Sequence, residues 1–293
     1  MTLNEILLIV AALLPAIILC VYVYRLDKVE KEPIWLLLKL FLFGAVCCFP
    51  AAYIEGILIE GIDLIFSGFS VKTPEGKVLM AKSTYYIYNF LKFFIGVALV
   101  EEGLKWITMN RVAGDKKDFN CLFDGMVYSV FTSLGFAALE NVFYVLEYGW
   151  VNAFMRGVLS VPGHMFFAVM MGYHYSLSAI LKKARNIEEE LLSSGAISEN
   201  SGMFDSSHST KMSFIIPILA HTVYNFSCSV NMWWATVLFY GFVIFMYRHC
   251  FKKLKNMSAA DTTHGNIVSY LIDKKYPELR QTDVDEILIE TME

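Results

Sequence analysis

Charged side chains are scarce in this sequence. Only 18% of its 293 residues are Asp, Glu, Lys or Arg, whereas 56% are hydrophobic. A water-soluble domain of this length has no need for so much apolar surface, and its exposed face would carry more charge. The shortage of charge argues against a soluble globular protein. The net charge of −4 gives no reason to expect a nucleic-acid partner.

Several familiar signatures are also missing. The six cysteines show no C-x-x-C spacing and lie in or beside apolar stretches, which is typical of buried thiols rather than disulfides or a zinc cage. No H-E-x-x-H motif occurs, so a metal site would have to be assembled from separate helices. No basic region precedes the first apolar run, which favours a retained first helix over a cleaved signal peptide.

Long apolar runs, in contrast, are abundant, and their length matches the roughly 20 residues that a helix needs to cross a bilayer core. Only helices and closed barrels satisfy the backbone in lipid, and runs this continuous indicate helices. We therefore predict an all-α, polytopic transmembrane bundle. Seven spans are expected, at about residues 4–25, 34–58, 85–109, 121–147, 152–181, 213–229 and 231–248, and the second could continue toward residue 66.

The Lys and Arg residues of the loops predict the orientation of these spans. They gather after the first, third, fifth and seventh spans, which share one side of the membrane if the span count is odd. The chain is therefore expected to be a multi-pass protein of the cell (cytoplasmic) membrane, with the N-terminus outside and the C-terminus in the cytoplasm.

Composition also divides the chain. We predict a transmembrane bundle over residues 1–250 and a cytoplasmic tail over 251–293. The Ser-rich, acidic segment 186–212 is expected to be a mobile cytoplasmic loop. Within the tail, NIVSYLIDKK and VDEILIETM could form short amphipathic helices.

The third span carries three charges at its centre, in the stretch ALVEEGLKWI. A charged side chain there costs about 2.5–3.5 kcal/mol on insertion scales. Lys105 follows Glu101 by four residues and Glu102 by three, so it can pair with either carboxylate on one helix face. An internal ion pair explains one glutamate and leaves the other without a structural reason.

Three further spans each place a polar group deep in an apolar helix: Glu140 in the fourth, His164 in the fifth, and His221 with Asn225 in the sixth. Small residues share the faces of Glu140 and His164, which predicts close helix packing there. Each group alone is more typical of a hydrogen bond between helices. Together they are the parts of a water-activating site, and the same groups suit zinc.

Two other polar residues are interpreted structurally. Asp124, at the start of the fourth span, is expected to be its N-cap. Arg156 is expected to reach toward the outer interface or to pair with a carboxylate such as Glu147.

The ordered set of motifs resembles the PrsW family of intramembrane proteases over roughly residues 85–228. The motifs are EExxK at 101–105, DG at 124–125, GFAALEN at 135–141, His164 in mid-helix, and HxxxN at 221–225. The chain is similar, more distantly, to CAAX endopeptidases and bacteriocin-immunity proteins. The resemblance implies catalytic roles for Glu101, Glu102, His164 and His221, with Glu140 and Asn225 at the other motif positions.

The resemblance further implies that the substrate is a membrane-anchored protein such as an anti-sigma factor. The family is classed among metallopeptidases, and a metal-free glutamate mechanism is argued for its relatives. A divalent metal such as zinc could be held by the four catalytic positions, and both mechanisms stay open.

The leading hypothesis is an intramembrane endopeptidase. Glu101 or Glu102 would be the general base on water, with His164 beside it. His221 and Asn225 would steady the scissile carbonyl and its oxyanion, and Lys105 and Glu140 would support the site.

Two alternatives come from other classes. Buried Glu and His also mark transporters and proton relays, although no inverted repeat is visible. A catalytically inactive membrane scaffold would keep the same fold, but every candidate catalytic position is occupied here.

Overall fold

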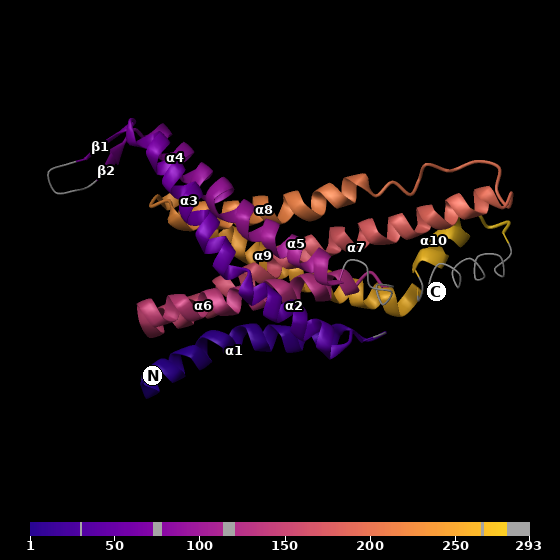
Figure 1. Cartoon of the computed structure of the whole chain (residues 1–293), viewed down its shortest axis with the longest axis horizontal. Coiled ribbons are helices and arrows are strands. Elements are labelled where there is room, and N and C mark those ends of the chain that lie inside the picture. Colours follow the sequence, from indigo (N-terminus) through magenta and orange to yellow (C-terminus); the bar gives the residue numbers. More distant parts are fainter. Residues whose placement is uncertain (30, 73–77, 114–120, 265–266, 280–293) are drawn as a thin grey trace.

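The computed structural model is a bundle of long helices with a small β-hairpin at one end (Figure 1). It describes residues 1–29, 31–72, 78–113, 121–264 and 267–279. The elements in chain order are α1 (Leu3–Leu26), α2 (Ile34–Val46), α3 (Cys48–Ser67), β1 (Ser70–Lys72), β2 (Val78–Met80), α4 (Lys82–Leu91), the π-helix η1 (Lys92–Ala98), α5 (Leu99–Ala113), α6 (Asp124–Val158), α7 (Ser160–Ser193), α8 (Ser207–Ser229), α9 (Trp233–His264) and α10 (Ile267–Lys275).

The all-α prediction is confirmed, apart from the antiparallel pairing of β1 with β2. Within the described residues, four helical stretches are long and apolar enough to cross a membrane: Leu3–Leu26, Ile34–Ser67, Asp124–Ser193 and Trp233–Asp261. The count of seven spans and their orientation remain predictions.

The second predicted span, 34–58 with an extension toward residue 66, is divided into two helices, and the helical extension is confirmed. A break at Cys47 separates α2 from α3, which continues to Ser67. The break has a local cause, because Pro50 has no N–H to donate to the carbonyl of Val46, four residues earlier.

The connection between the fourth and fifth predicted spans differs from the prediction. Helix α6 continues past residue 147 but turns sharply at Gly149, which has φ 76° and ψ −159°. A positive φ of this kind suits glycine, which has no Cβ. The following residues, up to Val158, fold back toward the preceding part of α6.

Asp124 is not the N-cap of α6, because Phe123 occupies that position. Asp124 is the first helical residue, and its Oδ2 accepts a hydrogen bond from the backbone N–H of Cys121 at 2.7 Å.

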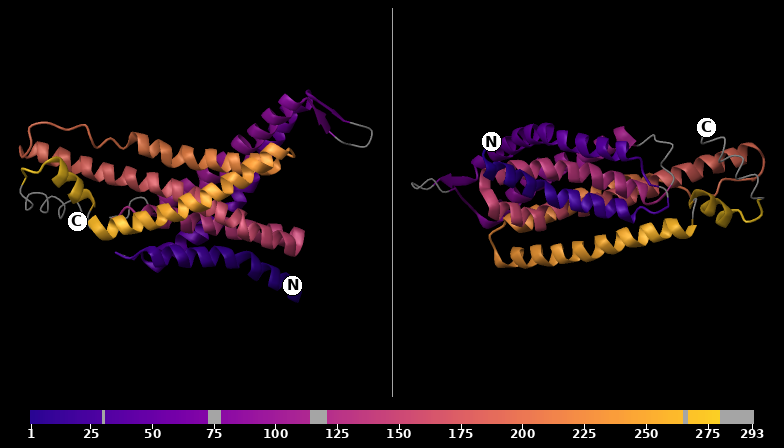
Figure 2. Two further views of the ribbon diagram at one scale, coloured as in Figure 1. Left: turned by 180° about the vertical axis from the view of Figure 1, so that it is seen from behind. Right: turned by 90° about the horizontal axis from the view of Figure 1, so that it is seen from below.

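The helices at the C-terminal end of the molecule are longer than predicted. Helix α7 continues to Ser193 and α8 begins at Ser207, so less of the segment 186–212 is irregular than expected. Helix α9 passes the predicted domain boundary at 250 without a break (Figure 2). The segment NIVSYLIDKK contains α10 as predicted, whereas VDEILIETM lies outside the described residues.

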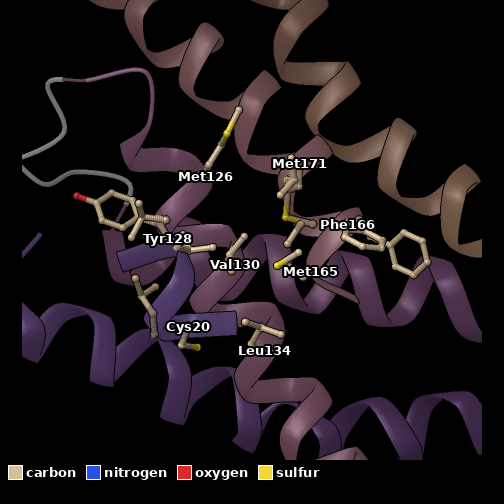
Figure 3. Close-up of a cluster of buried hydrophobic side chains, with 14 of the residues drawn as sticks. Cys20, Met126, Tyr128, Val130, Leu134, Met165, Phe166 and Met171 are labelled. Atoms are coloured by element: carbon tan, nitrogen blue, oxygen red, sulfur yellow. The ribbon is translucent and has the colours of Figure 1, made fainter. Parts of the chain in front are cut away.

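Helix α6 is the centre of the bundle and packs against α1, α2 and α7. Figure 3 shows part of the apolar core around it, to which Met126 and Leu134 of α6, Met165 and Phe166 of α7 and Cys20 of α1 contribute.

Small residues let the helices approach α6 closely. The hydroxyl of Ser129 donates to the carbonyl of Ala168 at 2.7 Å, and that of Ser133 to the carbonyl of His164 at 3.0 Å. The predicted small-residue faces of the fourth and fifth spans therefore meet, and their contact places His164 against α6.

Candidate active site

The predicted polar residues converge on one cavity of about 700 Å³ inside the helix bundle. Those that line it are Glu101 from α5, Glu140 from α6, His164 from α7, and His221 and Asn225 from α8. Glu102 is the exception, because its side chain is fully buried and does not line the cavity. The residues that the sequence grouped into one water-activating site therefore lie together, but Glu102 is placed outside the cavity wall.

Lys105 joins the polar residues into one network. Its Nζ lies 2.9 Å from Oε2 of Glu101, 2.8 Å from Oε1 of Glu102 and 3.0 Å from Nδ1 of His164. The ammonium also lies 4.2 Å from the centre of the Phe136 ring. Sequence spacing predicted that Lys105 could pair with either glutamate, and in the structure it pairs with both.

The partners of the two imidazoles determine which ring nitrogen carries the proton. A lysine ammonium can only donate, so Nδ1 of His164 accepts from Lys105, and Nε2 donates to Oε2 of Glu140 at 3.1 Å. A carboxylate can only accept, so Nδ1 of His221 donates to Oε1 of Glu102 at 3.0 Å. The remaining nitrogen of His221, Nε2, is therefore the one available to a substrate.

The two adjacent glutamates have different surroundings. Oε1 of Glu102 receives hydrogen bonds from both Lys105 and His221, and its Oε2 is buried with no hydrogen-bond partner. Glu101 forms part of the cavity wall, and its Oε2 lies 3.9 Å from Nδ1 of His164. Glu101 can therefore contact a molecule in the cavity. Glu102 lies outside the cavity wall and orients His221 through its hydrogen bond to Nδ1.

The cavity also contains charged residues that sequence reasoning missed. Glu55 of α3 and Lys92 of η1 both line it. Glu55 lies inside the predicted second span, where an acidic residue in an apolar run was the signal that could have identified it. Arg156 pairs with a carboxylate, as expected, but its partner is not Glu147. Its Nη2 donates instead to Oε2 of Glu140 at 2.7 Å.

Comparison with known proteins identifies the family of the chain. The model of the PrsW family of intramembrane metalloproteases matches residues 32–248. The chain belongs to the PrsW family. It is therefore a membrane-embedded peptidase, as predicted, and membership of this family favours the enzyme over the transporter and the scaffold.

Curated relatives support the assignment along most of the chain. The chain is 30% identical to Protease PrsW of Oceanobacillus iheyensis over 216 residues, which covers 74% of this chain and 80% of the relative. It is 34% identical to Protease PrsW of Geobacillus kaustophilus, over 61% of this chain and 69% of the relative. The relative from Clostridioides difficile is 28% identical over 83% of this chain and 88% of its own length. No solved structure is significantly similar to the chain.

The family description raises the question of whether this chain can bind a metal. Donor atoms of Glu101, Glu102 and His164 lie within 4.8 Å of one another, and all three residues are buried. Two carboxylates and an imidazole are a donor set that suits zinc, and Oε2 of Glu102 has no other partner. The residues therefore fit a divalent ion, although the ammonium of Lys105 contacts the same three side chains.

A Lys105→Met variant is expected to bind zinc more tightly than the wild type. The ammonium and a divalent ion carry like charges and use the same donors, so they compete for them. Methionine keeps a similar length and removes that competition. We expect zinc to raise the melting temperature of the detergent-solubilised variant by more than it raises that of the wild type.

Lys252→Met, which removes an exposed lysine of α9, serves as the control and should respond to zinc like the wild type. Equal zinc responses of Lys105→Met and the wild type would show that the two cations do not compete.

Proposed function

We propose that this protein hydrolyses a peptide bond in a membrane-anchored protein, such as an anti-sigma factor, with Glu101 as the general base. One observation carries the proposal: Glu101, His164, His221 and Asn225 line a single cavity, while Glu102 lies behind it. A cavity lined by a carboxylate and several hydrogen-bonding groups is suited to activating water against an amide.

Glu101 takes a proton from the attacking water as the hydroxyl adds to the carbonyl carbon. It then gives this proton to the amine nitrogen when the C–N bond breaks. His164 lies beside Glu101, with Nδ1 3.9 Å from Oε2 of the carboxylate, and limits where the water can lie.

His221 and Asn225 act on the carbonyl group of the scissile bond and not on the water. They are one helical turn apart on α8, and both line the cavity. The amide of Asn225 donates to the oxyanion, and His221 in its protonated form donates through Nε2. The carboxylate of Glu102, 3.0 Å from Nδ1, balances the positive charge that His221 then carries.

A divalent ion would be held by Glu101, Glu102 and His164, and it would supply Lewis-acid polarisation of the carbonyl and a more acidic water. His221 is not among these three, so it keeps its hydrogen bond to Glu102 in either case.

We also propose a topology of seven spans, with the N-terminus outside, the C-terminal tail (251–293) in the cytoplasm and residues 1–250 as the transmembrane bundle. The N-terminus and the hairpin of β1 and β2 lie at one end of the molecule and α10 at the other (Figure 1). A tag at the C-terminus should therefore react only from the cytoplasm, and a tag in the 67–82 segment only from outside. Labelling of both tags from the same side would contradict an odd span count.

The substrate proposal is tested by comparing membrane-protein fragments in cells that carry the wild type and in cells that carry the Glu101→Gln variant. We expect at least one fragment of a membrane-anchored protein to disappear in the variant while its intact precursor accumulates. Identical fragment profiles, with both proteins present at equal levels, would overturn the proposal. A reporter made from the protein identified in this way then serves for the kinetic measurements below.

A further inference from the structure

The side chain of Arg156 reaches the catalytic cavity from a residue that is distant along α6. Arg156 and Glu140 are 16 residues apart, and they can meet only because the chain turns back at Gly149. Arg156 and Glu140 both line the cavity, and their side chains are 16% and 21% exposed. An ion pair at this position therefore contacts the site itself and is not confined to the surface.

Three contacts hold the guanidinium in one orientation. Nη2 donates to Oε2 of Glu140 at 2.7 Å, and Nε donates to Oδ1 of Asn141 at 3.0 Å. The guanidinium carbon also lies 3.9 Å from the centre of the Tyr144 ring. The planar fork of arginine can make all three contacts at once, which a lysine ammonium cannot do.

The network is anchored on the first helix. Asn141 is fully buried, and its Nδ2 donates to the carbonyl oxygen of Ala12 in α1 at 2.9 Å. Because arginine only donates, Oδ1 of Asn141 must face Arg156, which agrees with its amide nitrogen facing Ala12. Helix α1 thus fixes Asn141, and Asn141 fixes one edge of the guanidinium.

The effect of Arg156 on the site passes through a single oxygen atom. Oε2 of Glu140 accepts from Nη2 of Arg156 and also from Nε2 of His164, at 2.7 and 3.1 Å. Without the guanidinium, three carboxylates of the network around Lys105 and His164 would share one cation, the ammonium of Lys105. These are the carboxylates of Glu101, Glu102 and Glu140. Glu140 would then be free to turn away from the imidazole that it orients.

We propose that Arg156 is a positioning residue for the hydrolysis, which holds Glu140 so that Glu140 fixes the ring of His164 beside Glu101. This inference rests on the proposed function, because it assumes that His164 lies at the reacting water. Arg156 itself does not contact the scissile bond in this scheme. Its removal should therefore slow the chemical step and leave substrate binding nearly unchanged.

The test is a double-mutant cycle on the membrane-anchored reporter. Arg156→Gln should lower kcat by about 10- to 100-fold, the usual effect of displacing a catalytic group by about 1 Å, and should change KM by less than about threefold. Arg156→Lys should recover part of the loss, because its ammonium can still reach Glu140. In a Glu140→Gln background, replacing Arg156 should change kcat by less than about twofold, because the two residues act through one contact.

Arg248→Gln, at an exposed arginine of α9, is the matched control and should keep wild-type kinetics. Elution volume and melting temperature establish that each variant is folded. If Arg156→Gln does not fold, the Arg156→Lys variant and the Glu140→Gln/Arg156→Gln double variant, which removes both charges together, complete the test.

Two results would overturn the inference. The first is that the effects of Glu140→Gln and Arg156→Gln on kcat multiply in the double variant. The second is that Arg156→Gln raises KM and leaves kcat unchanged. Either would indicate that Arg156 acts on the substrate independently of Glu140. An active Glu101→Gln variant would instead refute the proposed function, so the two failures are distinguishable.

Discussion

A Glu101→Gln variant is expected to insert and fold normally but to cleave its membrane substrate at least 10²- to 10⁴-fold more slowly, the usual contribution of a general base. Glutamine keeps the shape and the hydrogen-bonding reach of glutamate, but it cannot accept a proton from water. Its amide oxygen can still accept from Lys105, whose Nζ lies 2.9 Å from Oε2 of Glu101. The rate constants are measured on the purified protein in lipid nanodiscs with the membrane-anchored reporter.

Glu102→Gln should also be inactive and folded, for a different reason. Oε1 of Glu102 accepts from both Lys105 and His221, so the substitution removes the charge that balances a protonated His221. The triple variant Glu101→Gln, Glu102→Gln, Lys105→Met separates a structural role from a catalytic one. Removing a buried charge cluster with side chains of similar size is often neutral for folding, so this variant should fold and be inactive.

Retention of activity in the triple variant would mean that the three charges only neutralise one another. An active Glu101→Gln/Glu102→Gln double variant would equally exclude this pair from the chemistry.

Gly135→Ala is expected to destabilise the bundle more than any exposed substitution would. An added Cβ would lie 1.9 Å from the carbonyl oxygen of Phe41 in α2, and only a shift of the backbones could relieve that contact. Overpacking typically lowers the free energy of unfolding by about 1–3 kcal/mol. Because this clash is with backbone atoms, we expect a loss at or above the upper end of that range. We expect a melting temperature several degrees lower in detergent, with reduced cleavage because α6 also carries Glu140.

The reciprocal position provides a second test of the same contact. Gly44 of α2 faces the carbonyl oxygen of Thr132 in α6, and a Cβ there would lie 2.0 Å from it. Gly44→Ala should therefore destabilise the protein similarly, and the two effects should not add, because separating the helices once relieves both clashes. Gly61→Ala is the matched control, since no atom lies within 4 Å of a Cβ at that position. Equal melting temperatures of Gly135→Ala and Gly61→Ala would exclude a tight crossing of α2 and α6.

Some features of the site could be predicted from local patterns. Glu101 and Lys105 are one helical turn apart, as are His221 and Asn225, so each pair shares a helix face regardless of the rest of the fold. The small residues that accompany His164 predicted close packing, and hydrogen bonds from Ser129 and Ser133 to α7 are consistent with it. Cys47 marks a break that could also have been predicted, because Pro50 follows three residues later.

The difference between Glu101 and Glu102 could not be predicted in this way. Adjacent residues of a helix point in directions about 100° apart, and both glutamates fit an ion pair with Lys105 equally well. Only the placement of α8 decides that Glu102 meets His221, a residue 119 positions later. The partner of Arg156 likewise could not be predicted, because its contact with Glu140 requires the reversal at Gly149.

The sequence by itself determined that this protein is helical and spans a membrane, because hydrophobic run length is a local property that lipid and the backbone impose. Its motifs pointed to the PrsW family by resemblance, and the match of the family model over residues 32–248 shows that membership. The tertiary structure alone decided which carboxylate faces the cavity and which cation holds Glu140. The physical reason is that these contacts join residues far apart in the chain, such as Lys105 and His164, which are 59 positions apart. Whether such residues meet depends on how closely the small residues of α6 allow α2 and α7 to approach.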